Sequence, residues 1–369
     1  MLRVHLSPSK VAVIGGGNGA RAFAGHLALK GAQVRLGSSL PGELNGIAAA
    51  GGVTLEGAVT GFGPVEVTGD DFARALEGAA LILVVVPAFA HRDIARALAP
   101  HLVDGQTVIL NPGRTGGALE FAHVLKAAGC RAQVHLAETQ TLLYACRAVG
   151  ASGVSVKGVK HAVTLAAFPA AGTSAVLAAL EPYFTEFKPA PTVLDTSLMN
   201  IGAVFHPATV LLNAGRVEAG EDFEFYRDGM TPAVTAVLER IDAERVAVAQ
   251  SLGARVLTAK EWLAAVYDAR GATLHEALLS NSAYHEIKAP TSLKVRYLLE
   301  DLPTGLVPIA SLGAVAGVPT PVCRAVVELG NAALGADFWH SGRTAENLGL
   351  SGLDRAGLRT YLETGRKGS

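Results

Sequence analysis

The chain has 369 residues, of which 50% are hydrophobic and 17% are charged, and its formal net charge at pH 7 is −1. This length fits two domains of ordinary size, each with a substantial core. The balanced charge does not indicate the basic surface of a nucleic-acid-binding protein or the polybasic patch of a membrane-surface protein. We therefore expect small-molecule partners and no nucleic acid.

The sequence shows no pattern of membrane insertion or export. The longest apolar run, AALILVVVPAFA from Ala79, is far shorter than the roughly 20 residues that span a bilayer. The N-terminal MLRVHLSPSK lacks the apolar stretch of a signal peptide. The cysteines, Cys130, Cys146 and Cys323, are odd in number and share no metal-ligand spacing. We expect a cytoplasmic protein without a membrane span, a disulfide framework or a metal site.

Strand-like runs alternate with helical patterns through the first half of the chain. KVAVIG (10–15) precedes a helix to about Lys30, and further strand-like runs cover 32–37, 81–86, 106–111, 132–138, 153–158 and 161–168. Helical patterns end near His101 and Ala128. Strands separated by helices predict an α/β fold with a doubly wound parallel sheet of the Rossmann type.

From about Thr196 the chain changes to a helical pattern. Apolar residues recur at helical spacing in three segments, 198–215, 234–253 and 321–335. Pro189 and Pro191 mark the hinge before them. We therefore predict a dinucleotide-binding Rossmann domain over residues 1–188 and a mostly α-helical domain, carrying substrate and catalytic residues, over 189–369.

A glycine loop follows the first predicted strand. Gly15, Gly17 and Ala20 form a G-x-G-x-x-A pattern at the mouth of a predicted helix. Gly15 allows the tight turn, Gly17 lets the backbone approach a pyrophosphate, and Ala20 keeps the helix close to the sheet. The helix N-terminus presents free N–H groups to the phosphates. A glycine-rich turn that binds nothing is the alternative, and the strand, turn and helix context favours the dinucleotide site.

The tip of the second predicted strand bears on the choice of cofactor. It reads Gly37-Ser38-Ser39 where NAD enzymes normally place an acidic residue. Hydroxyls can donate to a 2′-phosphate that a carboxylate would repel, so the tip slightly favours NADP(H), and NAD(H) stays compatible. Arg21 and Arg35 are nearby cations that the sequence does not assign to the phosphate. The predicted cofactor-binding residues are Gly15, Gly17, Asn18, Gly19, Ala20, Ser38, Ser39 and Pro87.

The helical half contains candidate catalytic residues. His206 lies in an apolar helical pattern directly before Pro207, and a helix break there would turn the histidine toward a cavity. Arg296 and Asp301 follow far downstream. A His–Asp pair suits general acid–base catalysis, and the planar fork of an arginine suits a substrate carboxylate. From the residues alone, a core histidine and an exposed or helix-capping aspartate are the alternatives.

Six segments carry a resemblance to a known family: GGGNGA, NPGRTGG, ETQTLLYACR, NIGAVFHPATVLLNAG, RYLLEDLPTGLVPIASLGAVAGVPTP and SGRTAENLGL. In this order, and over nearly the whole chain, the sequence resembles the octopine/nopaline (opine) dehydrogenase family. The resemblance implies NAD(P)H-dependent reductive condensation of an amino-acid amine with a 2-oxo acid such as pyruvate, together with the reverse oxidation. The product is an N-(carboxyalkyl)amino acid. A homodimer is compatible with the resemblance.

The resemblance also implies roles for particular residues. It places the catalytic histidine on His206 and its partner on Asp301. It places the substrate-binding arginine on Arg296 and the threonine that binds the oxo acid on Thr141. Arg114 stands where some members have a glutamine, and we expect it to hold a second substrate carboxylate or to change the oxo-acid preference.

Two other functions are considered. The 3-hydroxy acid and ketopantoate-type NAD(P) dehydrogenases share the layout, but they use a lysine early in the second domain, and this chain has none between Lys188 and Lys260. A non-catalytic dinucleotide-binding sensor would bind the cofactor without turnover.

Overall fold

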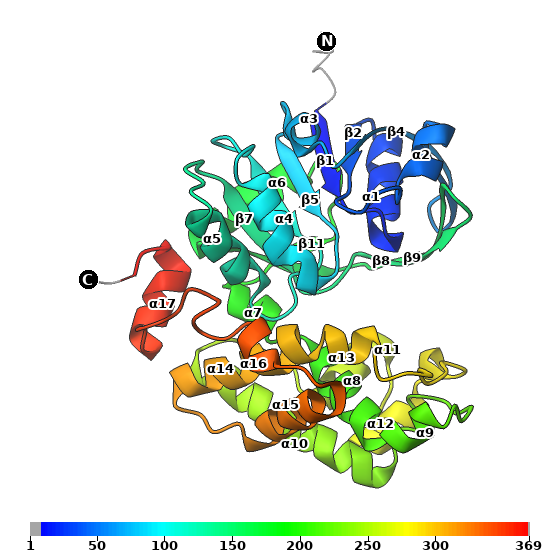
Figure 1. The fold of residues 1–369 in the computed structure, drawn as a ribbon, viewed down its shortest axis with the longest axis vertical. Coiled ribbons are helices and arrows are strands. Elements are labelled where there is room, and N and C mark those ends of the chain that lie inside the picture. The colour runs from blue at the N-terminus through cyan, green and yellow to red at the C-terminus, as the bar shows by residue number, and fades with distance from the viewer. Residues whose placement is uncertain (1–8, 368–369) are drawn as a thin grey trace. The chain divides into compact units, whose positions relative to one another are not determined.

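A computed structural model of the chain describes residues 9–367 (Figure 1). Residues 1–8 lie outside the described residues. They make up most of the N-terminal segment on which the expectation of no signal peptide depends. The chain divides into two compact units. The first comprises the residues up to Gly113, Gly117–Thr196 and Leu362–Gly365, and the second comprises Arg114–Gly116, Ser197–Tyr361 and the residues from Arg366. The main division thus follows Thr196, whereas the sequence analysis placed the boundary after residue 188.

The first unit is built on one sheet, whose strand order over the described residues is β11-β10-β7-β6-β5-β1-β2-β4-β3-β9-β8. The central strands pair in parallel from β4 through β2, β1, β5 and β6 to β7. Antiparallel pairs extend both edges, β10 on β7 and β3 on β4. The strands are β1 (Lys10–Ile14), β2 (Gln33–Gly37), β3 (Gly52–Gly57), β4 (Gly61–Gly69), β5 (Leu81–Val84), β6 (Thr107–Leu110), β7 (His135–Thr139), β8 (Tyr144–Val149), β9 (Gly153–Val159), β10 (Val163–Phe168) and β11 (Phe187–Pro189).

The core of this sheet explains its continuous apolar runs. Every residue of β5 and of β6 is buried, as expected for parallel strands covered on both faces. Helix α1 packs against β1 to β4. The helices of the unit are α1 (Asn18–Leu29), α2 (Asn45–Ala50), α3 (Phe72–Leu76), α4 (His91–Leu98), α5 (Gly117–Ala127), α6 (Thr173–Leu180) and α7 (Val193–Ser197), with 3₁₀ turns η1 (Ala88–Ala90) and η2 (Ala170–Gly172).

The hairpin of β3 and β4 was not predicted from the sequence. Its segment, GGVTLEGAVTGFGPVEVTG (51–69), has glycine throughout, which interrupts the alternation that marks a strand. Pairing with β2 on one side and β9 on the other holds this segment extended.

The second unit is helical, as predicted. Its helices are α8 (Ile201–Leu212), α9 (Ala214–Glu218), α10 (Pro232–Ser251), α11 (Ala259–Tyr267), α12 (Leu274–Ser280), α13 (Arg296–Leu299), α14 (Val307–Ala316), α15 (Pro321–Leu334), α16 (Phe338–Ser341) and most of α17 (Arg355–Thr364), with short turns η3 (Ser282–Tyr284) and the π-helical η4 (Leu302–Leu306). Capping boxes fix the starts of α11 and α12. Helix α8 packs against α10, α13, α15 and η4, so it lies inside the unit.

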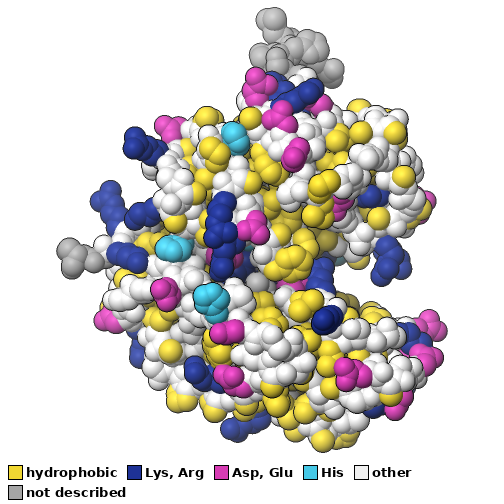
Figure 2. All heavy atoms as spheres, viewed as in Figure 1, with side chains coloured by type: hydrophobic (Ala, Val, Ile, Leu, Met, Phe, Trp, Pro, Cys, Tyr) yellow, Lys and Arg dark blue, Asp and Glu magenta, His cyan; other side chains and the backbone are white. Residues whose placement is uncertain are grey.

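One continuous stretch of the second unit, Arg296–Ala316, is long and apolar enough to cross a membrane by length and composition. Of its most apolar window, 78% is buried inside the protein, as in the core helix of a globular domain, and one such helix is weak evidence for a membrane span. On the face drawn in Figure 2, Lys and Arg side chains are interspersed with Asp and Glu, in keeping with the balanced net charge.

Candidate active site and cofactor loop

The glycine loop has the geometry that its sequence predicted. β1 ends at Ile14 and α1 begins at Asn18, so Gly15–Gly17 make the turn between them. Gly15 has φ +129°, and a Cβ built there would lie 2.3 Å from the carbonyl oxygen of Val85. Gly17 caps α1 without a side-chain hydrogen bond, and a Cβ built on it would meet nothing within 4 Å. Open space therefore faces the uncapped N–H groups of α1, which fits a pyrophosphate.

The steric role of Gly15 can be tested against a matched glycine. Gly31 also has a positive φ, +88°, but a Cβ there would be in open space. We expect Gly31→Ala to cost about 1–3 kcal/mol of stability through its backbone conformation alone. Gly15→Ala adds the clash with Val85, so it should also weaken NADH binding by roughly tenfold or more. Thermal unfolding and NADH titration of both variants check this, and equal NADH affinities would contradict it.

The other predicted cofactor residues lie at the same edge of the sheet or on α1. Asn18 Oδ1 accepts a hydrogen bond of 2.8 Å from the backbone N–H of Ala148. Gly19 and Ala20 are buried in α1, and Ser38 and Ser39 follow β2. Pro87 is half-buried after β5. Their cofactor roles stay predictions.

Glu43 also lies at this edge of the sheet, although it was not predicted from the sequence to bind the cofactor. The Ser38 hydroxyl donates a hydrogen bond to Oε2 of Glu43. The turn Leu40-Pro41-Gly42-Glu43 closes with a hydrogen bond from Glu43 N–H to Leu40 O at 3.3 Å, with Gly42 at φ +76°. Proline and glycine in these positions are typical of a type II turn, and this was the available signal.

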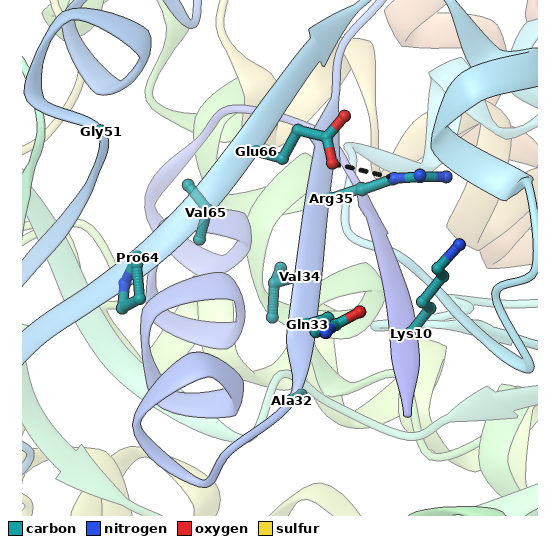
Figure 3. A pocket seen from close by; sticks show the side chains of 9 residues that line it. All are labelled: Lys10, Ala32, Gln33, Val34, Arg35, Gly51, Pro64, Val65 and Glu66. Atoms are coloured by element: carbon teal, nitrogen blue, oxygen red, sulfur yellow. Dashed lines mark hydrogen bonds and ion pairs between the residues drawn. The ribbon is translucent and has the colours of Figure 1, made fainter. Parts of the chain in front are cut away.

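A pocket of about 400 Å³ also lies in the first unit (Figure 3). Lys10 and Gln33, the first residues of β1 and β2, line it together with Arg35 and Glu66, whose side chains form an ion pair. Ligands of doubly wound sheets bind at the carboxyl ends of the strands, so we do not assign the cofactor to this pocket.

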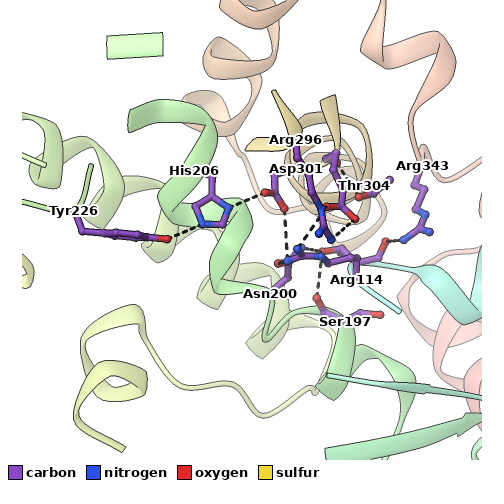
Figure 4. A network of polar contacts seen from close by, with 11 residues as sticks. Arg114, Ser197, Asn200, His206, Tyr226, Arg296, Asp301, Thr304 and Arg343 are labelled. Carbon is purple, nitrogen blue, oxygen red and sulfur yellow. Dashed lines mark hydrogen bonds and ion pairs between the residues drawn. The ribbon is translucent and has the colours of Figure 1, made fainter. Parts of the chain in front are cut away.

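In the second unit, the structure brings His206 and Asp301 together (Figure 4). His206 Nδ1 lies 2.7 Å from Asp301 Oδ2, and Nε2 lies 3.1 Å from the Tyr226 hydroxyl. An ionised carboxylate only accepts, so Nδ1–H donates to Asp301. In the neutral form of the ring, Nε2 accepts a hydrogen bond from the Tyr226 hydroxyl. The break expected at Pro207 is absent, because α8 continues through it. Packing of α8 among its neighbours holds the histidine in place instead.

Asp301 is buried and ionised. Burial alone would raise the pKa of its carboxyl group, but the charges of Arg114, His206 and Arg296 and the hydrogen bond from His206 outweigh burial and hold that pKa below its ordinary value. Arg114 Nη1 lies 3.6 Å from Asp301 Oδ1. Asp301 can therefore orient the imidazole and stabilise the imidazolium at neutral pH.

Arg114 contacts carboxylates of the protein itself. It has a positive φ of 57°, and its Nη1 donates to Asn200 Oδ1 at 3.1 Å. Its Nη2 lies 3.6 Å from the buried carboxylate of Glu300. The sequence analysis expected Arg114 to hold a substrate carboxylate, and that role stays a prediction. The geometry gives the guanidinium a second task, because it offsets two adjacent buried negative charges.

The turn that carries Arg114 is held from two sides. Thr115 Oγ1 donates to the carbonyl of Ser197 at 3.2 Å, and the buried Arg343 donates to the carbonyl of Thr115 at 3.0 Å. Arg343 belongs to the segment SGRTAENLGL, which therefore stabilises the Arg114 turn although it lies far from it in the sequence.

Arg296 pairs with Glu300 one helical turn away. Its Nε donates to Glu300 Oε2, and its Nη2 donates to Oε1 at 3.2 Å. The Arg296 side chain keeps 58% of its surface exposed, so it can still face a ligand. Thr141 belongs to the first unit, where its hydroxyl accepts a hydrogen bond of 2.8 Å from Lys160 Nζ. The substrate roles of Arg296 and Thr141 stay predictions.

Aromatic side chains surround His206. Tyr297 stacks on its imidazole with centroids 4.2 Å apart, and Tyr226 stacks on Tyr284 at 4.0 Å. Burial, followed by the neighbouring tyrosines Tyr297 and Tyr284, raises the pKa of Tyr226 well above its ordinary value. Tyr226 therefore keeps its proton as a donor to His206. This aromatic group was not predicted from the sequence, because its members are dispersed along the chain. Among residues 9–367, no group of three or more His, Cys, Asp or Glu side chains could hold a metal ion.

Comparisons with known proteins decide the family. The family model described as NAD/NADP octopine/nopaline dehydrogenase, alpha-helical domain, matches residues 189–334, and that of NADP oxidoreductase coenzyme F420-dependent matches residues 10–110. The chain is 40% identical over 353 residues to an opine dehydrogenase of Arthrobacter sp. (strain 1C), covering 95% of this chain and 98% of that protein. The chain belongs to the octopine/nopaline (opine) dehydrogenase family.

Further relatives and solved structures are similar to the chain over most of its length. The ocs protein of Agrobacterium vitis is 28% identical over 360 residues, which is 94% of this chain and 97% of that protein. An octopine dehydrogenase solved with NADH and L-arginine has a TM-score of 0.83 at 23% identity, covering 98% of this chain and 99% of that one. A yersinopine dehydrogenase with bound NADP⁺ has a TM-score of 0.70 at 18% identity, covering 96% and 98%. The predicted family, fold class and NAD(P)-dependent oxidoreductase class are confirmed.

Proposed function

We propose that the protein is an opine dehydrogenase, which uses a reduced nicotinamide dinucleotide to join the amine of an amino acid to the carbonyl carbon of a 2-oxo acid such as pyruvate. The observation that carries this proposal is the His206–Asp301 pair, with Nδ1 and Oδ2 2.7 Å apart, in a chain of this family. The reverse reaction oxidises the secondary amine and releases the two substrates.

The first unit would hold the cofactor. Gly15, Gly17 and the N-terminus of α1 would receive the pyrophosphate, and Pro87 would line the nicotinamide end of the site. When bound, the cofactor supplies the hydride that reduces the carbon of the former carbonyl. The residues of the chain supply positioning and proton transfer.

His206 accepts and donates the protons that the condensation requires. Only a neutral amine attacks the carbonyl, so His206 Nε2 takes a proton from the substrate ammonium, displacing the Tyr226 hydroxyl as its partner. The imidazolium, stabilised by Asp301, then returns a proton to the carbinolamine hydroxyl, which leaves as water and gives the protonated imine. Substrate ammonium and oxo acid thus become protonated imine and water, and addition of a hydride gives the secondary amine of the product.

Substrate carboxylates are held by Arg296 and Thr141. The exposed part of the Arg296 guanidinium offers donors to one carboxylate. Thr141, with Lys160 bonded to its hydroxyl, supplies a second polar position for the oxo acid. Ordering both substrates removes much of the entropic cost of a bimolecular step.

The finer cofactor preference has two opposing signals. The sequence of the tip after β2, with Ser38 and Ser39, favours NADP(H), whereas the carboxylate of Glu43, which accepts a hydrogen bond from the Ser38 hydroxyl, favours NAD(H). The cytoplasmic location stays a prediction. The homodimer stays a prediction.

The test is oxidation of NADH and of NADPH, followed by absorbance, with pyruvate or another 2-oxo acid in the presence and absence of pooled amino acids. Oxidation that requires both substrates is expected. Oxidation with the oxo acid alone would identify a hydroxy acid dehydrogenase instead. Cofactor binding without turnover across the pools would favour the sensor.

A further inference from the structure

The carboxylate of Glu43 lies against the glycine loop. A Cβ built on Gly16 would lie 2.5 Å from Glu43 Oε2, and the Ser38 hydroxyl donates to the same oxygen. Gly16 follows β1 and Ser38 follows β2, and these strands are parallel neighbours in register at Ile14 and Gly37. The carboxylate is therefore at the carboxyl edge of the sheet, between the first two strands.

We infer that Glu43 accepts hydrogen bonds from the hydroxyls of the adenosine ribose and makes the protein selective for NAD(H) over NADP(H). The adenosine ribose of doubly wound dinucleotide domains binds at this point of the sheet, where an acidic residue at the end of the second strand meets its hydroxyls. Here the chain delivers the carboxylate from the turn after Ser39. This inference rests on the proposed use of a nicotinamide dinucleotide, and it reverses the expectation drawn from the Gly37–Ser39 tip.

Neither of the two nearby arginines, Arg21 and Arg35, is available to neutralise the charge of a 2′-phosphate placed beside Glu43. Arg21 donates through Nε to Gly16 O at 3.0 Å and through Nη1 to the carbonyls of Gly150 and Gly153. Arg35 pairs with Glu66 at 3.1 Å and with Glu77 at 3.4 Å, and its Nη1 also donates to the carbonyls of Arg74 and Glu77. Figure 3 shows the Arg35 side chain directed to Glu66. Both guanidinium groups are thus engaged with the protein.

Ser38 has a positioning role in this arrangement. Its hydroxyl donates to Glu43 and accepts from the Leu40 N–H at 3.1 Å, and the residue is only 5% exposed. The hydroxyl therefore holds the Glu43 side chain across the loop. A donor already used on Glu43 is not available to a 2′-phosphate.

The inference is tested by equilibrium titration of NADH and NADPH, and of the fragments 5′-AMP and 2′,5′-ADP, onto wild type, Glu43→Gln and Ser38→Ala. The control is Glu56→Gln, which removes an exposed carboxylate of β3 in the same unit. Wild type should bind NADH about tenfold to a hundredfold more tightly than NADPH. The reason is that NADPH loses the charge-assisted hydrogen bonds between the ribose hydroxyls and Glu43. Glu43→Gln should abolish most of that ratio by weakening NADH and strengthening NADPH. Ser38→Ala should weaken NADH severalfold, and Glu56→Gln should keep the wild-type ratio.

A wild-type protein that binds NADPH as tightly as NADH would overturn the inference, as would an unchanged ratio in a Glu43→Gln protein that unfolds like wild type. If Glu43→Gln does not fold, Ser38→Ala and the wild-type fragment ratio decide. These titrations need no amino acid or oxo acid. The NADH to NADPH affinity ratio can therefore be measured even if the protein does not catalyse the proposed reaction. A ratio near one would contradict the role of Glu43 without contradicting the proposed reaction.

Discussion

Replacing His206 with asparagine is expected to lower kcat by about 10²–10⁴-fold, the usual contribution of a positioned acid–base group. Asparagine retains a polar side chain beside Asp301, but it cannot exchange a proton with the amine or the carbinolamine at neutral pH. The glycine loop is untouched, so NADH affinity should stay near that of wild type. Steady-state kinetics and an NADH titration on the same preparation provide the measurement.

The matched control for this variant is His340→Asn. His340 is an exposed histidine of the same unit, whose backbone N–H donates to Asp337 and whose carbonyl accepts from Asn347. It should keep wild-type kcat. If His206→Asn kept its turnover, the imidazole would not be the acid–base group, and proton transfer would have to be assigned to another residue.

Asp301→Asn is expected to lower kcat by about 10²-fold or more, because the neutral amide no longer stabilises the imidazolium and can present a donor to Nδ1. The ring would then favour the other tautomer, with the proton on Nε2, where it cannot accept from the substrate. The pH–rate profile should also change, since the acid form of His206 loses its neighbouring negative charge. An unchanged profile together with unchanged kcat would show that the pair has no catalytic role.

The same substitution should have a pH-dependent effect on stability. The folded pKa of Asp301 is depressed below its ordinary value of 3.8, so its ionisation stabilises the folded protein above about pH 4. That contribution is lost as the pH falls through the depressed folded pKa. Asp301→Asn should therefore be less stable than wild type at pH 7, and the difference should narrow on acidification. Denaturant unfolding at a series of pH values measures it, and a pH-independent difference would contradict this assignment.

Much of the chemistry of the second unit could be predicted from motifs, but its contacts could not. His206 and Asp301 were named from the segments that carry the family resemblance, and the structure brings them into contact. Asn200, Tyr297 and Glu300 lie within those segments, but the motifs do not show what these side chains contact. Tyr226 lies outside the segments. Arg114 shows the limit most clearly. Its sequence neighbours say nothing of Glu300, and only the path of the chain brings the two charges within 3.6 Å.

The sequence by itself determined the features that depend on local chemistry. Continuous apolar runs require burial on both faces and so specify parallel central strands. The backbone at φ +129° requires glycine at position 15, and the G-x-G-x-x-A pattern is readable without any contact information.

The tertiary structure decided the features that depend on packing between distant segments. Pairing with β2 and β9 made strands of the glycine-rich β3–β4 segment, and packing kept α8 helical through Pro207. A turn after Ser39 brought Glu43 back onto the glycine loop, where the sequence had shown only serines. In each case the local preference is weak, and the outcome is set by neighbours that the linear sequence does not place.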